Sequence, residues 1–185
     1  MTRDRSGLPR YFVFIRAINV GKRRLTNDEL MAPFVQLGLE DVSAYQAAGN
    51  ITFRTSDPKM TERDRLEAIL ADAYGFDPVA FVRTLAELQD ITQAHPFTDQ
   101  QLAGTGGRVQ VSFLHEAPSE PKMAQVRSRI PDDDLIAFVD REWFWLPKDG
   151  VSDSRLPVSA VENLIGPLTM RTLGTVARML ARFER

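Results

Sequence analysis

The chain has 185 residues, no cysteine and a net charge of −2 from 23 basic and 25 acidic side chains. The missing cysteines exclude disulfides, thiolate zinc sites and cysteine nucleophiles. The balanced charge excludes a global field that would draw the protein onto nucleic acid or anionic lipid. No apolar run approaches the roughly 18 residues of a membrane span, and the N-terminus lacks a signal peptide's apolar core, so we expect a cytoplasmic protein without a membrane partner.

The first half of the chain predicts alternating strands and helices. Short runs rich in β-branched and aromatic residues indicate strands, and apolar residues at helical spacing indicate helices. The predicted elements are a strand at 11–17, a helix between 26 and 38, strands at 42–45 and 51–55, a helix at 62–74, a strand at 79–83 and a helix that stops before residue 96. This βαββαβ order with an added helix is the ferredoxin-like plan.

Local signals accompany these elements. Thr26 and Glu29 have the spacing of a capping box at the start of the first helix. Pro33 predicts a kink in that helix, because a proline removes a backbone donor and strains the preceding turn. Gly49 and Asn50 predict the hairpin turn between the second and third strands, since this pair adopts positive dihedral angles easily.

The segment PFTDQQLAGTGG that follows is polar and rich in glycine, which indicates a linker. After it the pattern restarts with a strand at 108–114, a helix at 121–130, a hairpin formed by 134–140 and 142–147, and helices at about 158–164 and 171–183. The sequence therefore predicts an α+β protein of two duplicated ferredoxin-like halves, the second having lost its last strand to extra C-terminal helices. The predicted parts are a flexible N-terminus at 1–10, a first half at 11–96, a linker at 97–107 and a second half at 108–185 packed on the first.

Two predicted strands are apolar on both sides. Residues 11–15 and Leu135–Val139 show no polar face, and such strands belong to sheets that are covered on both faces. Because a ferredoxin-like half carries helices on one face only, we expect the other face to be covered by the opposite half or by the terminal helices. This argues against an open sheet presented to RNA.

Catalytic templates are missing from the chain. It contains no GxSxG, HExxH, GxxxxGK[ST] or GxGxxG. His95 and His115 lie at predicted element ends, the carboxylates at 132–134 indicate a solvated turn, and Trp143 and Trp145 share one strand face as core residues do. The sequence therefore identifies no catalytic residue, no metal site and no cofactor.

The loop IRAINVGKRRLTNDEL, residues 15–30, is the best candidate for a binding site. Arg16 ends an apolar strand, so we expect its guanidinium to be partly buried and to meet either an internal acceptor or a ligand. Asn19 offers a donor and an acceptor, and Gly21 allows a close backbone approach. The free amides of the following helix favour an anion, although the carboxylates at 28–29 compete there. The basic residues at 22–24 indicate a solvated turn.

Four segments carry a resemblance to a known family: FIRAINVGKRRLTNDEL, AYQAAGNITF, LPKDGVSDSRL and TMRTLGTVARML. In order and spacing, from Tyr11 to about Ala181, they resemble the bacterial family called domain of unknown function 1697. The resemblance implies a duplicated ferredoxin-like architecture and brings no established activity. The residues that it implies for a ligand site are Arg16, Asn19, Gly21, Asn50, Arg171 and Thr175.

The chain departs from that family's pattern within the same motifs. The departures replace most of the polar side chains by apolar ones, and only one of them restores a hydroxyl. They are Ala17, Ala47, Ala48, Thr172, Leu173 and Gly174. If the three motifs converge on one site, the resemblance implies a reduced version of it here.

Two arginines with asparagines and a threonine resemble a binding constellation more than an acid/base pair. We therefore expect a module that binds a small anionic ligand, a nucleotide or a phosphorylated metabolite, at Arg16, Asn19 and Arg171. The alternatives are nucleic-acid binding, an enzyme that uses the two histidines, and a structural or protein-association role in which the motif arginines bond internally. The sequence leaves the oligomeric state open.

Overall fold

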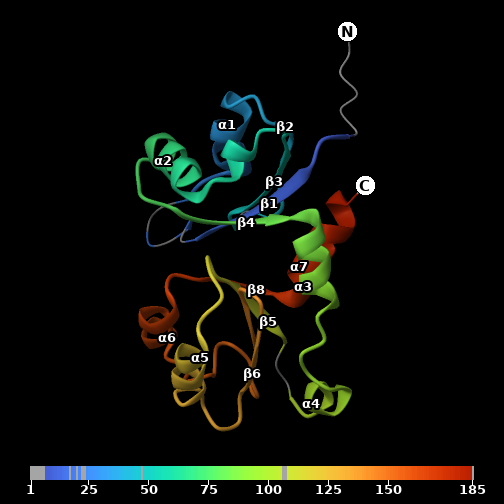
Figure 1. Cartoon of the computed structure of the whole chain (residues 1–185), viewed down its shortest axis with the longest axis vertical. Helices are drawn as coiled ribbons and strands as arrows, with labels where there is room; N and C mark the ends of the chain where they lie inside the picture. Colours follow the sequence, from blue (N-terminus) through green and yellow to red (C-terminus); the bar gives the residue numbers. More distant parts are fainter. Residues whose placement is uncertain are drawn as a thin grey trace. The chain divides into compact units, whose positions relative to one another are not determined.

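The computed structural model describes residues 7–16, 18–19, 21, 24–46, 48–105 and 108–184 (Figure 1). Contacts divide the chain into two compact units, Met1–Gln89 together with Arg182–Arg185, and Asp90–Ala181. Unit 1 therefore contains both ends of the chain. Within the described ranges, no helix is long and apolar enough to cross a membrane.

Unit 1 contains a four-stranded antiparallel sheet with the strand order β2-β3-β1-β4. Its elements are β1 (Arg10–Arg16), α1 (Asn27–Gln36), β2 (Glu40–Ala44), β3 (Asn50–Arg54), the 3-10 helix η2 (Pro58–Thr61), α2 (Arg63–Tyr74), β4 (Val79–Thr84) and the start of α3 (Leu85–Gln93). The predicted capping box forms at Thr26, and α1 continues unbroken through Pro33. The predicted βαββαβ order is confirmed.

Helices α1 and α2 cover one face of this sheet (Figure 1). Leu30 and Phe34 of α1 and Leu66 and Leu70 of α2 recur at helical spacing, and all four are fully buried or nearly so. They pack against the apolar side chains of alternate strand positions, which are Val13, Ile15, Ile51, Phe53 and Ala80. Burial of these side chains, at about 1.5–3 kcal/mol each, is the main stabilisation of the unit.

The face of sheet 1 without these helices is buried as well. Phe12, Phe14 and Phe81 are at most 1% exposed, and so is Arg83. The strand registers place these four side chains on one face, because Phe12 lies opposite Arg83 and Phe14 lies opposite Phe81. The prediction that β1 is buried on both faces is confirmed.

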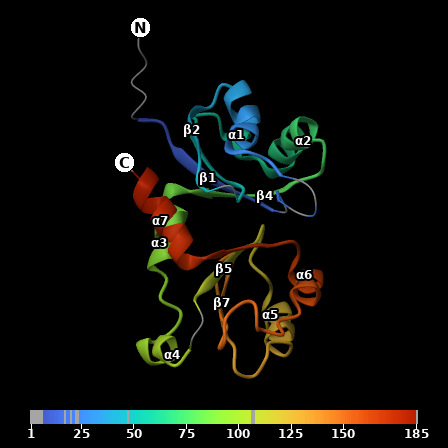
Figure 2. The same cartoon turned by 180° about the vertical axis from the view of Figure 1, so that it is seen from behind.

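Unit 2 repeats the topology of unit 1, with the strand order β6-β7-β5-β8. Its elements are the end of α3, α4 (Asp99–Ala103), β5 (Gln110–Phe113), α5 (Glu120–Arg127), β6 (Leu135–Val139), β7 (Glu142–Leu146), α6 (Val158–Ile165), β8 (Thr169–Thr172) and α7 (Leu173–Phe183). Helices α5 and α6 lie side by side over one face of its sheet, as Figure 2 shows from behind. Trp143 and Trp145 are buried beneath them. The duplicated ferredoxin-like α+β architecture is confirmed.

The prediction that the second half lacks its last strand is wrong. Residues Thr169–Thr172 form β8, which pairs with β5 at the position that β4 occupies in unit 1. Arg171 therefore lies in a strand, whereas the sequence placed it in the last helix. The sequence Thr-Met-Arg-Thr is too short to show alternation, and only the hydrogen bonds to β5 define it as a strand.

Two local predictions also change. Gly49 has a positive φ of 73° as expected, whereas Asn50 already lies in β3. Among the described residues of the turn, Gln46 also has a positive φ, at 57°. The glycine-rich segment predicted as a linker contains the short helix α4, whose start is a capping box of Thr98 and Gln101. That spacing was visible in the sequence. Gly106 and Gly107 of the same segment lie outside the described residues.

Candidate functional site

The first loop and the hairpin of the predicted site meet at one end of sheet 1. A Cβ atom on Gly49 would lie 2.6 Å from the carbonyl oxygen of Ile15 and 2.8 Å from Cγ1 of Ile18. The backbone amide of Ile15 donates a hydrogen bond of 2.7 Å to the carbonyl of Gly49. The hairpin turn therefore packs directly against the end of β1.

Arg16 and Asn50 lie on the same face at this end of the sheet. Asn50 is opposite Phe14 in the β1–β3 register, and Arg16 follows Phe14 by two positions and faces Val79 of β4. Arg16 is half-buried, in line with its place at the end of an apolar strand, and Asn50 is 1% exposed. Two of the three motif segments are thus joined in unit 1.

The described part of the first loop closes on itself. The side-chain oxygen of Asn19 accepts a hydrogen bond of 3.1 Å from the amide of Leu25. Gly21 has a φ of 63°, and its carbonyl accepts a bond of 3.1 Å from Arg24. Asn19 and Gly21 therefore shape the loop. Ala17, Val20, Lys22, Arg23 and Ala47, on which other sequence expectations fell, lie outside the described residues.

The N-terminus of α1 is already capped by a carboxylate of the same helix, that of Glu29. The side chain of Glu29 accepts hydrogen bonds of 2.8 Å from both the amide and the hydroxyl of Thr26, and the hydroxyl of Thr26 accepts one of 3.2 Å from the amide of Glu29. The bond from the backbone of Thr26, followed by that from its hydroxyl, lowers the pKa of Glu29. The competition expected from the acidic residues at 28–29 is therefore real, and this helix start is a poor anion site.

The side chain of Asn50 stabilises the hairpin between β2 and β3 through a hydrogen bond to the backbone. Its side-chain amide donates a hydrogen bond of 3.1 Å to the carbonyl of Tyr45, and the amide of Tyr45 donates one of 2.8 Å to the carbonyl of Asn50. The hairpin turn is thus closed by a side chain as well as by the backbone. This contact explains an asparagine at position 50 without any ligand.

The third motif forms one junction between β8 and α7 in unit 2. The guanidinium of Arg171 donates hydrogen bonds of 2.9 Å to the hydroxyl of Thr169 and 2.8 Å to the carbonyl of Met170, and burial lowers its pKa to about 10. The hydroxyls of Thr172 and Thr175 lie 2.7 Å apart, and the amide of Thr175 donates to the hydroxyl of Thr172. Thr172, a departure from the family pattern, therefore caps α7.

An internal repeat links this junction to unit 1. The tripeptide Arg-Thr-Leu occurs at 83–85, between β4 and α3, and again at 171–173, between β8 and α7. Arg83 donates a hydrogen bond of 2.9 Å to the carbonyl of the preceding residue, as Arg171 does at 2.8 Å. The repeated tripeptide was the signal that could have predicted both β8 and the similarity of the two arginines.

The family described as "Protein of unknown function (DUF1697)" matches residues 8–144. The chain belongs to this family. Among solved structures, the conserved bacterial protein SP0830 from Streptococcus pneumoniae is similar, with 23% identity, a TM-score of 0.73 and coverage of 96% of this chain and 99% of that one. At this identity the similarity shows the fold alone. No curated protein matches the chain.

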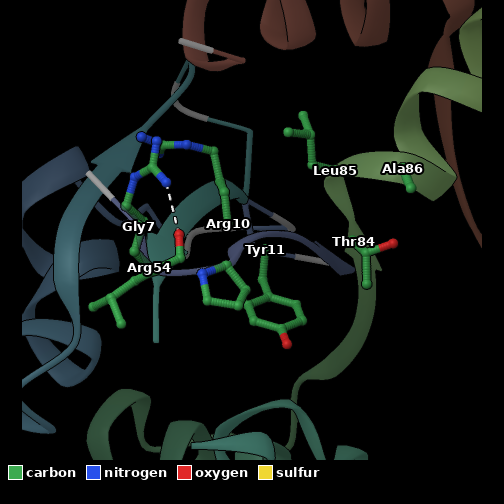
Figure 3. Close-up of a pocket in the computed structure, with 9 residues that line it drawn as sticks. Gly7, Arg10, Tyr11, Arg54, Thr84, Leu85 and Ala86 are labelled. Atoms are coloured by element: carbon green, nitrogen blue, oxygen red, sulfur yellow. Dashed lines mark hydrogen bonds between the residues drawn. The ribbon is translucent and has the colours of Figure 1, made fainter. Parts of the chain in front are cut away.

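A cavity of about 290 Å³ opens in unit 1 where β1 begins and β4 ends (Figure 3). Tyr11, Leu85 and the backbone before β1 give it a mostly apolar lining. Arg54 donates a hydrogen bond of 2.7 Å to the carbonyl of Leu8, and both Arg54 and Arg10 form ion pairs with Asp41. Because Asp41 offsets one of the two positive charges and the lining is mostly apolar, this cavity does not resemble an anion site.

The acidic run at 132–134 proves to be partly structural. Asp134 accepts hydrogen bonds from the indole of Trp145 at 2.9 Å, the amide of Lys148 at 2.9 Å and the hydroxyl of Ser154 at 2.8 Å. The prediction of a solvated turn is therefore wrong for Asp134, which joins the hairpin to the loop that follows it. Among the described residues, no group of histidine, aspartate and glutamate side chains could hold a metal ion.

Proposed function

We propose that this protein of the DUF1697 family binds a small anionic ligand, a nucleotide or a phosphorylated metabolite, through Arg16. The observation that carries the proposal is the contact of Gly49 with Ile15 and Ile18, which brings Arg16 and Asn50 to one end of sheet 1. The planar guanidinium of Arg16 supplies N–H donors that suit phosphate and carboxylate oxygens, while Asn50, which is 1% exposed, fixes the hairpin beside it.

Arg171, in strand β8 of unit 2, is a second candidate for anion binding. Its guanidinium is partly withdrawn from water, and this burial lowers its pKa to about 10. A partly buried guanidinium interacts more strongly with an anion than a fully exposed one does. This favours a role for Arg171 in ligand binding as well.

A thermal-shift panel of nucleotides, sugar phosphates and inorganic phosphate at low ionic strength tests the proposal. We expect at least one compound to raise the melting temperature of the parent protein, and the Arg16→Ala variant to lose most of that shift. Arg65→Ala is the matched control, because it removes the same charge from an exposed position of α2 in the same unit. Equal responses of the parent and of Arg16→Ala contradict the proposal.

A structural role is the second candidate, favoured by the hydrogen bonds of Asn19 and Asn50 to backbone groups of their own segments. It predicts that Arg16→Ala lowers the free energy of unfolding by about 1–3 kcal/mol without any ligand effect, because the partner of this half-buried side chain is left unsatisfied. A ligand site predicts unchanged or increased stability of the free protein, because function often keeps a destabilising group in place. Urea unfolding of Arg16→Ala separates the two.

Nucleic-acid binding remains an alternative with its own signature. Each phosphate contact releases counterions, so the affinity for single-stranded RNA or DNA would fall steeply as salt rises. The net charge of −2 provides no general attraction. If the protein does not bind single-stranded RNA or DNA even at low salt, this alternative is removed.

A further inference from the structure

The edge strand β6 of unit 2 has an unusual composition. Its five residues, Leu135–Val139, are all apolar, and β6 pairs with β7 on one side only. In the part of the chain that the structure describes, no backbone hydrogen bond joins its outer edge to another segment. Val139 is 38% exposed, and the other four residues are half-buried. An apolar edge of this kind is a template for pairing with another strand.

The duplicated fold supplies an internal comparison. Strand β2 occupies the same position in unit 1, and its edge carries Glu40 and Asp41. Its register shifts between Glu40 and Ser43, and Asp41 has a φ of 50°. Charges and a bulge are the devices by which natural proteins prevent edge pairing. Unit 1 therefore has a protected edge, while the equivalent strand of unit 2 has neither a charge nor a bulge.

The geometry of the β6–β7 hairpin indicates which backbone N–H and C=O groups of β6 point toward the free edge of the sheet. A two-residue loop joins Val139 to Glu142, and the residues that flank such a loop exchange both ladder hydrogen bonds. Because this pattern alternates, the backbone groups of Leu135, Ala137 and Val139 point toward β7. Those of Ile136 and Phe138 point toward the free edge.

The strand is complementary to itself in the antiparallel sense. With a two-fold axis at Ala137, Ile136 faces Phe138 of a second copy, so the residues with outward backbone groups meet and can exchange hydrogen bonds. Aromatic and β-branched side chains form favourable cross-strand pairs. Ala137 faces its own copy as a non-hydrogen-bonded pair, in which the Cα atoms approach to about 4.5 Å and a small side chain fits best.

We propose that β6 is a self-association edge, at which two copies of this chain join their unit 2 sheets through an antiparallel β6–β6 pair. The partner is a second copy, because the strand is uncharged, apolar on both sides and self-complementary about Ala137. Closed two-fold pairing also consumes the free edge, so the assembly stops at a dimer. This inference is independent of the proposed ligand.

A cysteine cross-linking experiment tests the interface directly, because the chain contains no cysteine of its own. The Cα separation of about 4.5 Å lies within the range that a disulfide bridges. We expect Ala137→Cys to form a disulfide-linked dimer under mild oxidation. Val35→Cys is the control, since Val35 on α1 is 58% exposed and random collisions would cross-link it more readily than position 137.

Light scattering on the parent protein, a chain of 20.8 kDa, gives the second measurement. We expect the mass of a dimer at micromolar concentration and a shift toward the monomer in Ala137→Lys, where two ammonium groups would face each other. Val35→Lys should keep the dimer. A parent that stays monomeric at millimolar concentration overturns the proposal, and so does Ala137→Cys that cross-links no faster than Val35→Cys. If Ala137→Lys does not fold, the cysteine comparison decides alone.

Discussion

Asn19, Asn50 and Thr175 carry polar side chains that the sequence offered to a ligand, and each of these side chains makes a hydrogen bond within its own segment. Asn19 closes the first loop onto Leu25, and Asn50 closes the hairpin onto Tyr45. Such local bonds satisfy backbone groups that would otherwise face water or remain unpaired. At the scale of single residues, the ligand proposal therefore depends on Arg16 and Arg171. The side chains of Asn19, Asn50 and Thr175 stabilise their own segments.

Gly49 gives the most direct prediction at this scale. Gly49→Ala adds a Cβ that would lie 2.6 Å from the carbonyl oxygen of Ile15, at a φ of 73°. The left-handed backbone costs about 1–2 kcal/mol and the clash about 1–3 kcal/mol more, so we expect a loss of about 3 kcal/mol in the free energy of unfolding. Urea unfolding measures it.

Gly38→Ala is the control for that variant. Gly38 has nearly the same φ, 72°, but nothing lies within 4 Å of its Cβ position. It should lose about 1 kcal/mol, from the backbone conformation alone. Equal losses in the two variants would show that the close approach of the hairpin to β1 does not contribute.

At the scale of elements, several helix starts carry a local signal in the sequence. Capping boxes at Thr26, Thr84 and Thr98 each involve a hydroxyl and a Glu or Gln three residues later. This spacing is readable in any sequence. The strand β8 carries no comparable local signal, and its pairing with β5 alone distinguishes it from the start of α7.

Tyr74 joins two elements, α2 and α1, and gives a pH-dependent prediction. Its hydroxyl donates a hydrogen bond of 2.7 Å to the carbonyl of Leu30, and burial raises its pKa well above the ordinary value. The folded protein therefore keeps this proton at a pH where the unfolded chain has lost it. The resulting stabilisation is complete below about pH 10 and is lost as the pH rises further.

Tyr74→Phe tests this linkage. We expect it to unfold about 1 kcal/mol more easily at pH 7, because the hydrogen bond is lost. Above pH 10 its stability should fall less steeply than that of the parent. Tyr11→Phe is the control, since the hydroxyl of Tyr11 makes no hydrogen bond to any residue that the structure describes. A parallel pH profile for parent and Tyr74→Phe would contradict the assignment.

At the scale of the whole molecule, the last residues of the chain belong to unit 1. The ring of Phe183 lies 5.8 Å from the guanidinium carbon of Arg10 and 6.3 Å, edge to face, from the ring of Tyr45. Arg10 starts β1 and Tyr45 opens the hairpin, so one C-terminal side chain supports two segments from the other end of the sequence.

Phe183→Ala should therefore weaken unit 1 although it changes the far end of the chain. An aromatic pair and a cation–π contact contribute about 0.5–1.5 and 0.5–1 kcal/mol, so we expect a loss of about 1–2 kcal/mol. Hydrogen exchange should become faster at the amide of Tyr45, which bonds Asn50. Phe183→Leu, which keeps apolar bulk, should recover part of the loss; unchanged exchange in Phe183→Ala would contradict the contact.

The sequence by itself determined the elements that carry local information. Periodic apolar residues gave α1 and α2, capping boxes gave helix starts, and the order of elements gave the ferredoxin-like plan, because each of these signals depends on neighbours within a few residues. The half-burial of Arg16 also followed from its own strand. All of these are consequences of short-range chemistry.

Only the tertiary structure decided the rest. It identified β8 by its pairing with β5, the approach of Gly49 to Ile15, and the three donors that surround Asp134. It also revealed that β6 keeps an unprotected edge where β2 does not. These features arise between segments far apart in the chain, where a residue's role depends on the partner that folding brings to it, and the sequence pattern around each residue does not contain that partner.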